Sequence, residues 1–162
     1  MSKIQQHFEN HLNRNALGFS FFIAIEAFLV ATLIGILASI LGAPERQIPV
    51  SDSVFLGLAL IFAPIFETLF FQAIPILLVR LCKGGVTIQI IISTLCFFGA
   101  HLGEGILTAI CAGIFAGFYF AFTFSHWAKK GKWKAIWVTG LTHFIYNSFA
   151  MSIYFIAKQA LI

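Results

Sequence analysis

Long apolar runs separated by short polar segments form the main pattern along this chain. Five runs are predicted to be membrane-spanning helices: residues 16–41, 54–79, 86–102, 105–127 and 135–157. Each run has at least the roughly 17 residues that a helix needs to cross about 30 Å of hydrocarbon. The runs do not alternate strictly as barrel strands do, and helices satisfy their own backbone hydrogen bonds in lipid. The pattern predicts an all-α, polytopic membrane helix bundle of about five transmembrane helices, in a single domain over 1–162.

The composition agrees with this interpretation. The chain has 162 residues, of which 60% are hydrophobic and only 10% are charged. A water-soluble domain of this size needs more polar residues to cover its surface. The first run is longer than the apolar core of a secretory signal peptide, about 7–15 residues, and it ends without a good cleavage site, so we expect it to be retained as a span.

The basic residues predict an orientation in the membrane. The segments expected on one side carry Lys3, Arg14, Arg80, Lys83, Lys129, Lys130, Lys132 and Lys134, whereas the other side carries only Arg46 and Lys158. Because Lys and Arg concentrate in cytoplasmic loops, we expect a multi-pass protein of the cell membrane with its N-terminus in the cytoplasm and its C-terminus outside. The basic residues are therefore a topology signal, and nucleic acid is not an expected partner. The sequence does not fix the oligomeric state.

The three cysteines do not form a recognisable framework. Cys82, Cys96 and Cys111 are odd in number, form no C-x-x-C pair, and lie in or beside apolar runs. We interpret them as small buried apolar residues rather than disulfide or zinc ligands.

Polar residues at membrane depth are costly and mark candidate sites. The helical rise places Glu67, His101, His143 and Asn147 roughly 12–22 Å from the cytoplasmic ends of their spans. We therefore expect three helices to bring a carboxyl group, two imidazoles and an amide to a similar level. Glu26 is interpreted as a structural, hydrogen-bonded carboxyl group, although a polar cavity is an alternative environment for it.

Local spacing supports this convergence. His143 and Asn147 are separated by four residues and share a helix face. Pro64 and Pro75 flank Glu67 and are expected to loosen or kink its helix. Small residues are expected to let helices approach one another at Gly99 and Gly103, on either side of His101, and at Gly113 and Gly117. Glu104 is interpreted as a solvated loop charge.

Three motifs in this chain resemble those of one membrane-protein family. Glu67-Thr68-x-x-x-Gln72, Phe97-x-x-x-His101 and His143-x-x-x-Asn147 occur in this order. They resemble the motifs E-E-x-x-x-R, F-x-x-x-H and H-x-x-x-N or D of the CPBP (CAAX protease and bacteriocin-processing, Abi) family of intramembrane proteases. That family includes the type II CAAX prenyl endopeptidases and bacteriocin immunity proteins. The resemblance covers about residues 54–150.

The resemblance implies an intramembrane endopeptidase that acts on a peptide or membrane-protein substrate. Glu67 corresponds to the general base that activates a water, and His101 to a residue that helps to hold that water. His143 and Asn147 correspond to the groups that stabilise the oxyanion. The family is often labelled metalloprotease, so a zinc ion held by Glu67, His101 and His143 is an alternative. The favoured mechanism requires no cofactor.

Two departures from the family pattern bear on activity. The second glutamate of the family is Thr68 here, and its arginine is Gln72. Both positions are neutral, which leaves no unpaired charge at depth, and we interpret them as a hydrogen-bonded pair in place of an ion pair. Loss of activity would accompany this change if the charged pair positions the substrate.

Two other functions remain open from the sequence. One is a non-catalytic immunity or regulatory protein that binds a peptide or protein partner in the same cavity. The other is an ion or proton transporter in which Glu26, Glu67 and the histidines form a relay. Transporters commonly contain internal inverted repeats, and the sequence shows none, so this function ranks last.

Overall fold

The computed structural model describes residues 11–42 and 51–160, and its regular structure is helical. Helices account for 89% of the described residues, among which there is no β-strand. The elements are α2 (Ala16–Ile40); α3 (Asp52–Gly57), η1 (Leu58–Phe62), α4 (Ala63–Glu67), η2 (Thr68–Ala73) and α5 (Ile74–Leu81); α6 (Val86–His101) and η3 (Leu102–Glu104); α7 (Ile106–Thr108), η4 (Ala109–Ala116) and α8 (Gly117–Trp127); and α9 (Lys132–Ala160). The prediction of an all-α helix bundle is confirmed.

Within the described residues, four helical segments are long and apolar enough to cross a membrane. They are residues 16–40, 52–81, 86–104 and 106–127. The fifth predicted span corresponds to α9, which has 29 residues but is not among these four. The helix α9 is less apolar than these four segments partly because it carries the polar residues Thr139, Thr142 and His143. All three are buried against the other helices.

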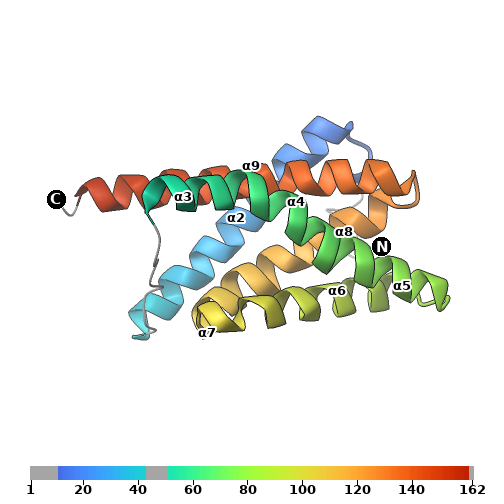
Figure 1. The fold of residues 1–162 in the computed structure, drawn as a ribbon, viewed down its shortest axis with the longest axis horizontal. Coiled ribbons are helices and arrows are strands. Elements are labelled where there is room, and N and C mark those ends of the chain that lie inside the picture. Colours follow the sequence, from blue (N-terminus) through green and yellow to red (C-terminus); the bar gives the residue numbers. More distant parts are fainter. Residues whose placement is uncertain (1–10, 43–50, 161–162) are drawn as a thin grey trace.

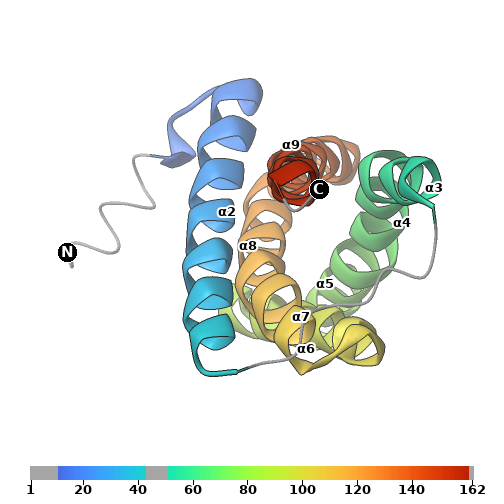
Figure 2. The ribbon, with the colours of Figure 1, turned by 90° about the vertical axis from the view of Figure 1, so that its left-hand side faces the viewer.

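The helices are arranged around α8. Figure 2 shows α8 in the middle, with α2, α9, the segment from α3 to α5, and α6 around it. Consecutive segments run in opposite directions along the molecule (Figure 1). The large side chains Phe19, Phe97, Phe120 and Phe124 are fully buried and form the centre of the core.

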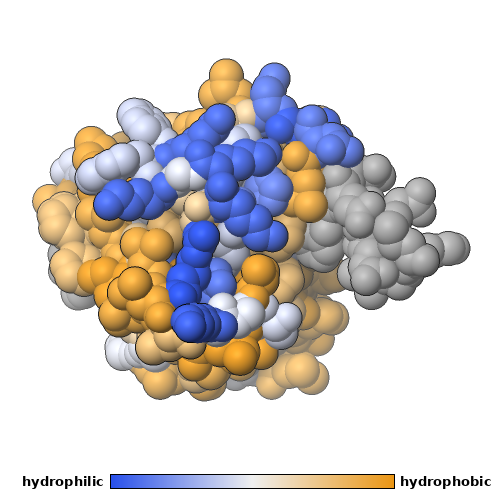
Figure 3. Space-filling view, turned by 90° about the vertical axis from the view of Figure 1, so that its right-hand side faces the viewer, coloured by the Kyte–Doolittle hydropathy of each residue, from blue (hydrophilic) through white to orange (hydrophobic). Residues whose placement is uncertain are grey.

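Basic side chains gather at one end of the bundle, which we call the basic end. Figure 3 shows a hydrophilic patch at this end, above and beside apolar surface. The exposed basic residues that follow or precede the helices there are Arg14, Arg80, Lys83, Lys129, Lys130, Lys132 and Lys134. Lys158 lies at the opposite end, where it donates hydrogen bonds of 2.8 and 2.7 Å to the two carboxylate oxygens of Asp52, and these bonds raise the pKa of Lys158. Lys3 and Arg46 lie outside the described residues.

The prolines on either side of Glu67 coincide with π-helical turns. In η1 the N–H of Ala63 donates to the carbonyl of Leu58, five residues earlier, and in η2 the N–H of Ile74 donates to the carbonyl of Leu69. Pro64 and Pro75 follow directly, and neither has an N–H to donate. The predicted loosening of this helix therefore takes the form of two widened turns, which are frequent at functional sites.

Close helix contact occurs at one of the two predicted glycine pairs. A Cβ atom on Gly113 would lie 2.6 Å from Cα of Phe98, and one on Gly117 would lie 2.7 Å from Cδ1 of Phe97. The predicted close-packing face is confirmed there. The prediction for Gly99 and Gly103 is wrong, because both are exposed and a Cβ atom on either would meet nothing within 4 Å.

The cysteines are free thiols, as expected. The prediction that they are buried is wrong for Cys82, which is exposed in the turn after α5, and for Cys96, which is exposed on α6, whereas Cys111 is half-buried.

We expect Gly113→Ala to destabilise the bundle by about 1–3 kcal/mol, the usual cost of overpacking. The added methyl group would meet the backbone of Phe98, which cannot move without displacing α6. Gly99→Ala is the matched control, because its methyl group enters open space and alanine favours a helix. Thermal unfolding of the purified protein in detergent checks this expectation, and equal midpoints for the two variants would contradict it.

Candidate active site

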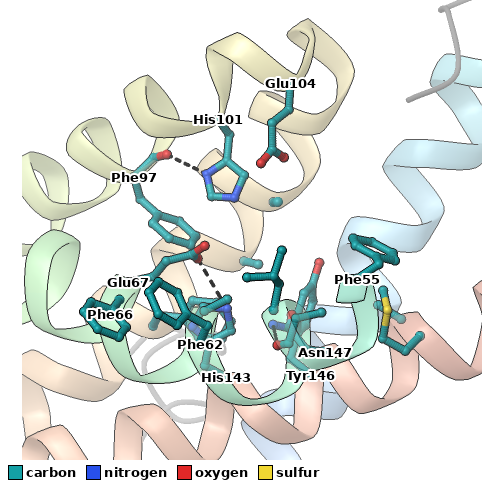
Figure 4. A pocket seen from close by; sticks show the side chains of 18 of the residues that line it. Phe55, Phe62, Phe66, Glu67, Phe97, His101, Glu104, His143, Tyr146 and Asn147 are labelled. Carbon is teal, nitrogen blue, oxygen red and sulfur yellow. Dashed lines mark hydrogen bonds and ion pairs between the residues drawn. The ribbon is translucent and has the colours of Figure 1, made fainter. Parts of the chain in front are cut away.

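A cavity of about 640 Å³ lies between four helical segments. Its walls are mainly apolar, with aromatic side chains from α3, η1, α4, α6, α8 and α9. Figure 4 shows five of these rings, those of Phe55, Phe62, Phe66, Phe97 and Tyr146. The carboxyl, imidazole and amide side chains in its lining are those of Glu67, His101, Glu104, His143 and Asn147. The structure thus brings the four predicted site residues together in one cavity. Glu104 is exposed, but it also forms part of the cavity wall, which differs from the interpretation as a loop charge alone.

Glu67 and His143 form the central polar pair. Oε2 of Glu67 lies 3.6 Å from Nε2 of His143, and the two side chains are 26% and 4% exposed. This distance is longer than a hydrogen bond, so the contact is electrostatic. Nδ1 of His143 is buried without a hydrogen-bond partner. A proton on Nε2, facing the carboxylate, is therefore the tautomer that the surroundings favour.

His101 is held by the backbone of its own helix. Its Nδ1 lies 2.9 Å from the carbonyl oxygen of Phe97. A carbonyl oxygen only accepts hydrogen bonds, so Nδ1 must carry the proton that is donated. In the neutral ring, Nε2 is then an acceptor, and Figure 4 shows the ring directed into the cavity. The spacing of the motif F-x-x-x-H thus orients the imidazole as well as placing it.

The ring of Phe97 lies between the two imidazoles. Its centroid is 4.5 Å from that of His101 and 6.0 Å from that of His143, with edge-to-face geometry in both contacts. The ring of Phe120 stacks on His143 at 4.3 Å. These contacts fix the two imidazoles at the cavity wall without using their polar atoms.

Asn147 is anchored to the loosened helix opposite it. Its Nδ2 donates a 2.7 Å hydrogen bond to the carbonyl oxygen of Ala59. That carbonyl lies five residues before Pro64, which has no N–H to donate to it. Buried carbonyl groups need a partner, and Asn147 supplies it. One N–H of the amide is therefore committed to the backbone, and one N–H and the amide oxygen remain for other contacts.

A second freed carbonyl is bonded in the same way. The hydroxyl of Ser93 on α6 donates a 2.7 Å hydrogen bond to the carbonyl oxygen of Phe71, which lies one α-helical turn before Pro75. Ser93 is not among the site residues predicted from the sequence. A signal was present, because Ser93, Phe97 and His101 are spaced by four residues and are among the buried residues of α6.

Thr68 and Gln72 do not form the predicted pair. Both are fully buried, at 1% and 0% exposure, but Thr68 Oγ1 and both amide atoms of Gln72 have no hydrogen-bond partner. The prediction of a hydrogen-bonded pair is therefore wrong. The two side chains share the buried side of η2 without reaching each other's polar atoms.

Glu26 belongs to a separate cluster. The hydroxyl of Tyr119 donates a 2.8 Å hydrogen bond to Oε1 of Glu26, and Nε2 of His11 lies 3.2 Å from Oε2. Glu26 is not part of the cavity lining. The structural interpretation of this carboxyl group agrees with these contacts, and a relay joining Glu26 to Glu67 through the cavity does not.

The side chains do not fit a three-ligand metal site as they stand. Within the described part of the chain, no three His, Cys, Asp or Glu residues converge closely enough to hold a metal ion. Glu67 and His143 are paired, while His101 is held on the adjacent wall by its bond to Phe97.

One comparison with known proteins gave a match. The model of the family "Type II CAAX prenyl endopeptidase Rce1-like" matches residues 49–149, more than half of the chain and the part that carries all the cavity-lining polar residues. No curated protein and no solved structure matched.

We expect Ser93→Ala to destabilise the bundle by about 1–3 kcal/mol, because the part-buried Phe71 carbonyl would lose this partner. The double variant Ser93→Ala with Pro75→Ala should lose less stability than the single variant, since alanine at position 75 restores a backbone N–H near that carbonyl. Ser152→Ala is the control, because the exposed Ser152 hydroxyl bonds only within α9. Unfolding midpoints in detergent measure all three, and an unshifted midpoint for Ser93→Ala would contradict the assignment.

Proposed function

This chain belongs to the Rce1-like family of type II CAAX prenyl endopeptidases, and on that premise we propose that it hydrolyses a peptide bond with a water activated by Glu67. It is a multi-pass membrane protein of a protease family, so its substrate is a peptide or protein segment that reaches the bilayer. The observation that carries the proposal is the Glu67 carboxylate beside His143, 3.6 Å away, in a cavity among the helices.

Glu67 has the position that a general base requires. Its carboxylate is partly exposed in the lining of the cavity, so a water and a peptide carbonyl have access to it. Glu67 takes a proton from this water while the water oxygen attacks the carbonyl carbon. The acceptor nitrogen of His101, directed into the same cavity, holds the second hydrogen of the water.

The attack places negative charge on the carbonyl oxygen. Two N–H groups are available for it: Nε2–H of His143 and the second amide N–H of Asn147. The cavity is mainly apolar, so donors that are fixed before the reaction stabilise this charge more than they would in water. The carbon–nitrogen bond then breaks, and Glu67 returns its proton to the leaving amine.

The orientation in the membrane is part of the proposal. The basic end carries seven exposed Lys and Arg residues from three segments. Because such residues favour the cytoplasmic side, we place the basic end in the cytoplasm. The N-terminus is then cytoplasmic, and the C-terminal end of α9 lies outside.

A non-catalytic role is the second candidate. Gln72 and Thr68 stand where the family pattern has charged residues, and neither has a hydrogen-bond partner. A protein that lost catalysis could keep the cavity as a binding site for a peptide or protein partner, as an immunity or regulatory protein.

We expect Glu67→Gln to abolish cleavage, because the amide cannot accept a proton from water. Mass spectrometry of membrane-fraction peptides compares cells that express the wild type and the variant at equal levels. Products that are present with the wild type and absent with Glu67→Gln are the expected result. Asp52→Asn is the matched control, because Asp52 is on the same helical segment but outside the cavity lining. Cells that express Asp52→Asn should still contain the cleavage products.

Identical peptide profiles for the wild type and Glu67→Gln, with both proteins folded and inserted, would favour the partner-binding role. Cross-linking from a photoreactive residue at Phe62, which lines the cavity, would then capture the partner directly.

Metal dependence is a separate test. We expect cleavage to continue after dialysis against a zinc chelator, because Glu67 activates the water without a Lewis acid. Activity that disappears with the chelator and returns only with added zinc would instead support the zinc alternative with Glu67, His101 and His143, and would require His101 to move toward the other two.

A further inference from the structure

The basic end carries positive charge that the described carboxyl groups do not balance. Its seven exposed Lys and Arg side chains come from the residues before α2 and from the turns that follow α5 and α8. Among the described carboxyl groups, Glu67 and Glu104 line the cavity, and Asp52 is paired at the opposite end. Glu26 bonds Tyr119 inside the bundle. In the described part of the chain, this end therefore has an excess of positive charge, which attracts anions.

Lys83 has a backbone conformation that usually belongs to glycine. Its φ is 59°, in the left-handed region, where a Cβ atom is strained. The turn is a Schellman motif, in which the N–H of Gly84 donates to the carbonyl of Val79 (2.8 Å) and the N–H of Lys83 to that of Arg80 (2.9 Å). Glycine is the usual residue at the left-handed position of this motif. The chain therefore keeps a lysine side chain at this turn against the preference of its backbone.

Two further ammonium groups are held beside one buried ring in the region of the α8–α9 turn. Nζ of Lys130 lies 4.3 Å from the ring centroid of Trp127, and Nζ of Lys134 lies 5.1 Å from it. The Trp127 side chain is 2% exposed, so its position is fixed by the bundle. Each ammonium group is attracted to the ring, but the two like charges repel each other. An anion with several acceptor oxygens, such as a phosphate group, relieves this repulsion by accepting hydrogen bonds from both.

Exposed tryptophans indicate that the basic end lies at a membrane surface. Trp133 and Trp137 are 72% and 77% exposed. They are four residues apart near the start of α9 and therefore share one face of this helix. Tryptophan is enriched where the hydrocarbon of a bilayer meets its headgroups. Phosphate groups of lipids are therefore the anions nearest to these lysines.

We propose that the basic end binds the headgroups of anionic phospholipids, with Lys83 on one turn and Lys130 and Lys134 near the other as its main contacts. Clusters of Lys and Arg beside membrane helices are known to attract anionic lipids. The same residues also act on topology, but topology requires neither a lysine in a left-handed conformation nor two ammonium groups at one ring. The interaction requires only that the basic end lies at a membrane surface, whichever side that is. It is independent of the proposed peptide hydrolysis.

Lipid binding is measured on the purified full-length chain in a neutral detergent. Native mass spectrometry detects the lipid molecules that remain bound after addition of phosphatidylglycerol or of phosphatidylcholine with the same acyl chains. These two probes differ in the net charge of the headgroup. We expect phosphatidylglycerol to bind at least tenfold more tightly, and its binding to weaken as ionic strength rises. Equal affinities for the two lipids would overturn the proposal.

Inorganic phosphate distinguishes a lipid from a soluble ligand. Added at the same concentration as phosphatidylglycerol, it should leave the bound lipid in place, because it lacks the acyl chains that keep the headgroup at this surface. Displacement of the lipid under these conditions would overturn the proposal and identify a free phosphate as the ligand.

Lys83→Gly is the most specific variant, because glycine fits the left-handed turn better than lysine does. We expect its affinity for phosphatidylglycerol to fall about fivefold, the usual contribution of one basic residue near an anionic surface. Its unfolding midpoint in lipid-free detergent should be equal to or higher than that of the wild type, so the loss of binding is not a loss of folding.

The double variant Lys130→Gln with Lys134→Gln should bind phosphatidylglycerol about 25-fold more weakly, since two basic residues are lost. Lys158→Gln is the matched control, because it removes an exposed lysine from the opposite end, and its affinity should equal that of the wild type. Unchanged affinity in both Lys83→Gly and the double variant would overturn the proposal. So would a loss in Lys158→Gln as large as that in Lys83→Gly.

Discussion

Every backbone carbonyl group of a membrane helix needs a hydrogen-bond partner, because lipid supplies none, and this constraint organises the centre of the molecule. Pro64 and Pro75 each remove one backbone donor from the helix that carries Glu67. The carbonyl groups of Ala59 and Phe71 are bonded instead by side chains of two other helices, Asn147 on α9 and Ser93 on α6. These two bonds join the helix of Glu67 to the helices that carry His143 and His101. The site therefore depends on backbone chemistry at least as much as on packing of apolar side chains.

The same constraint explains how polar residues are distributed. The buried face of α6 carries Gln89, Ser93, Phe97 and His101, and the three polar members each bond a backbone carbonyl oxygen. The exposed side chains on the other faces of α6 are mainly apolar, as expected for contact with lipid. These three polar side chains are tolerated at depth because each is bonded to a fixed backbone carbonyl oxygen, and His101 still keeps one nitrogen for chemistry.

The features that depend on a single helix were the most predictable from the sequence. The span predicted at residues 16–41 is observed as α2 over Ala16–Ile40, because hydrophobic length alone determines it. The depths of Glu67, His101, His143 and Asn147 also follow from helical rise, so their arrival in one cavity was predictable. The family pattern added the order of the motifs and a chemical role for each residue.

Contacts between helices were less predictable. Gly99 and Gly113 look equivalent in the sequence, but only Gly113 faces a neighbouring backbone. The Thr68 and Gln72 side chains have the spacing of a bonded pair, yet their polar atoms do not meet. The bond from Ser93 to Phe71 depends on which face of α6 packs against the segment 68–81. To predict such contacts, one must know which helix faces pack against each other, and the periodicity of the sequence does not give this information.

The contacts of Glu26 show that the helix bundle includes a residue that precedes α2. His11 precedes the first membrane helix, but its ring is buried and contacts the carboxyl group of Glu26 inside the bundle. Burying a carboxyl group with too few partners is costly. A shortened chain that begins at α2 would keep every predicted span and every residue of the cavity, and yet leave Glu26 with Tyr119 but without His11. The folded unit therefore includes a residue that precedes the first apolar run, and a polar contact holds it there.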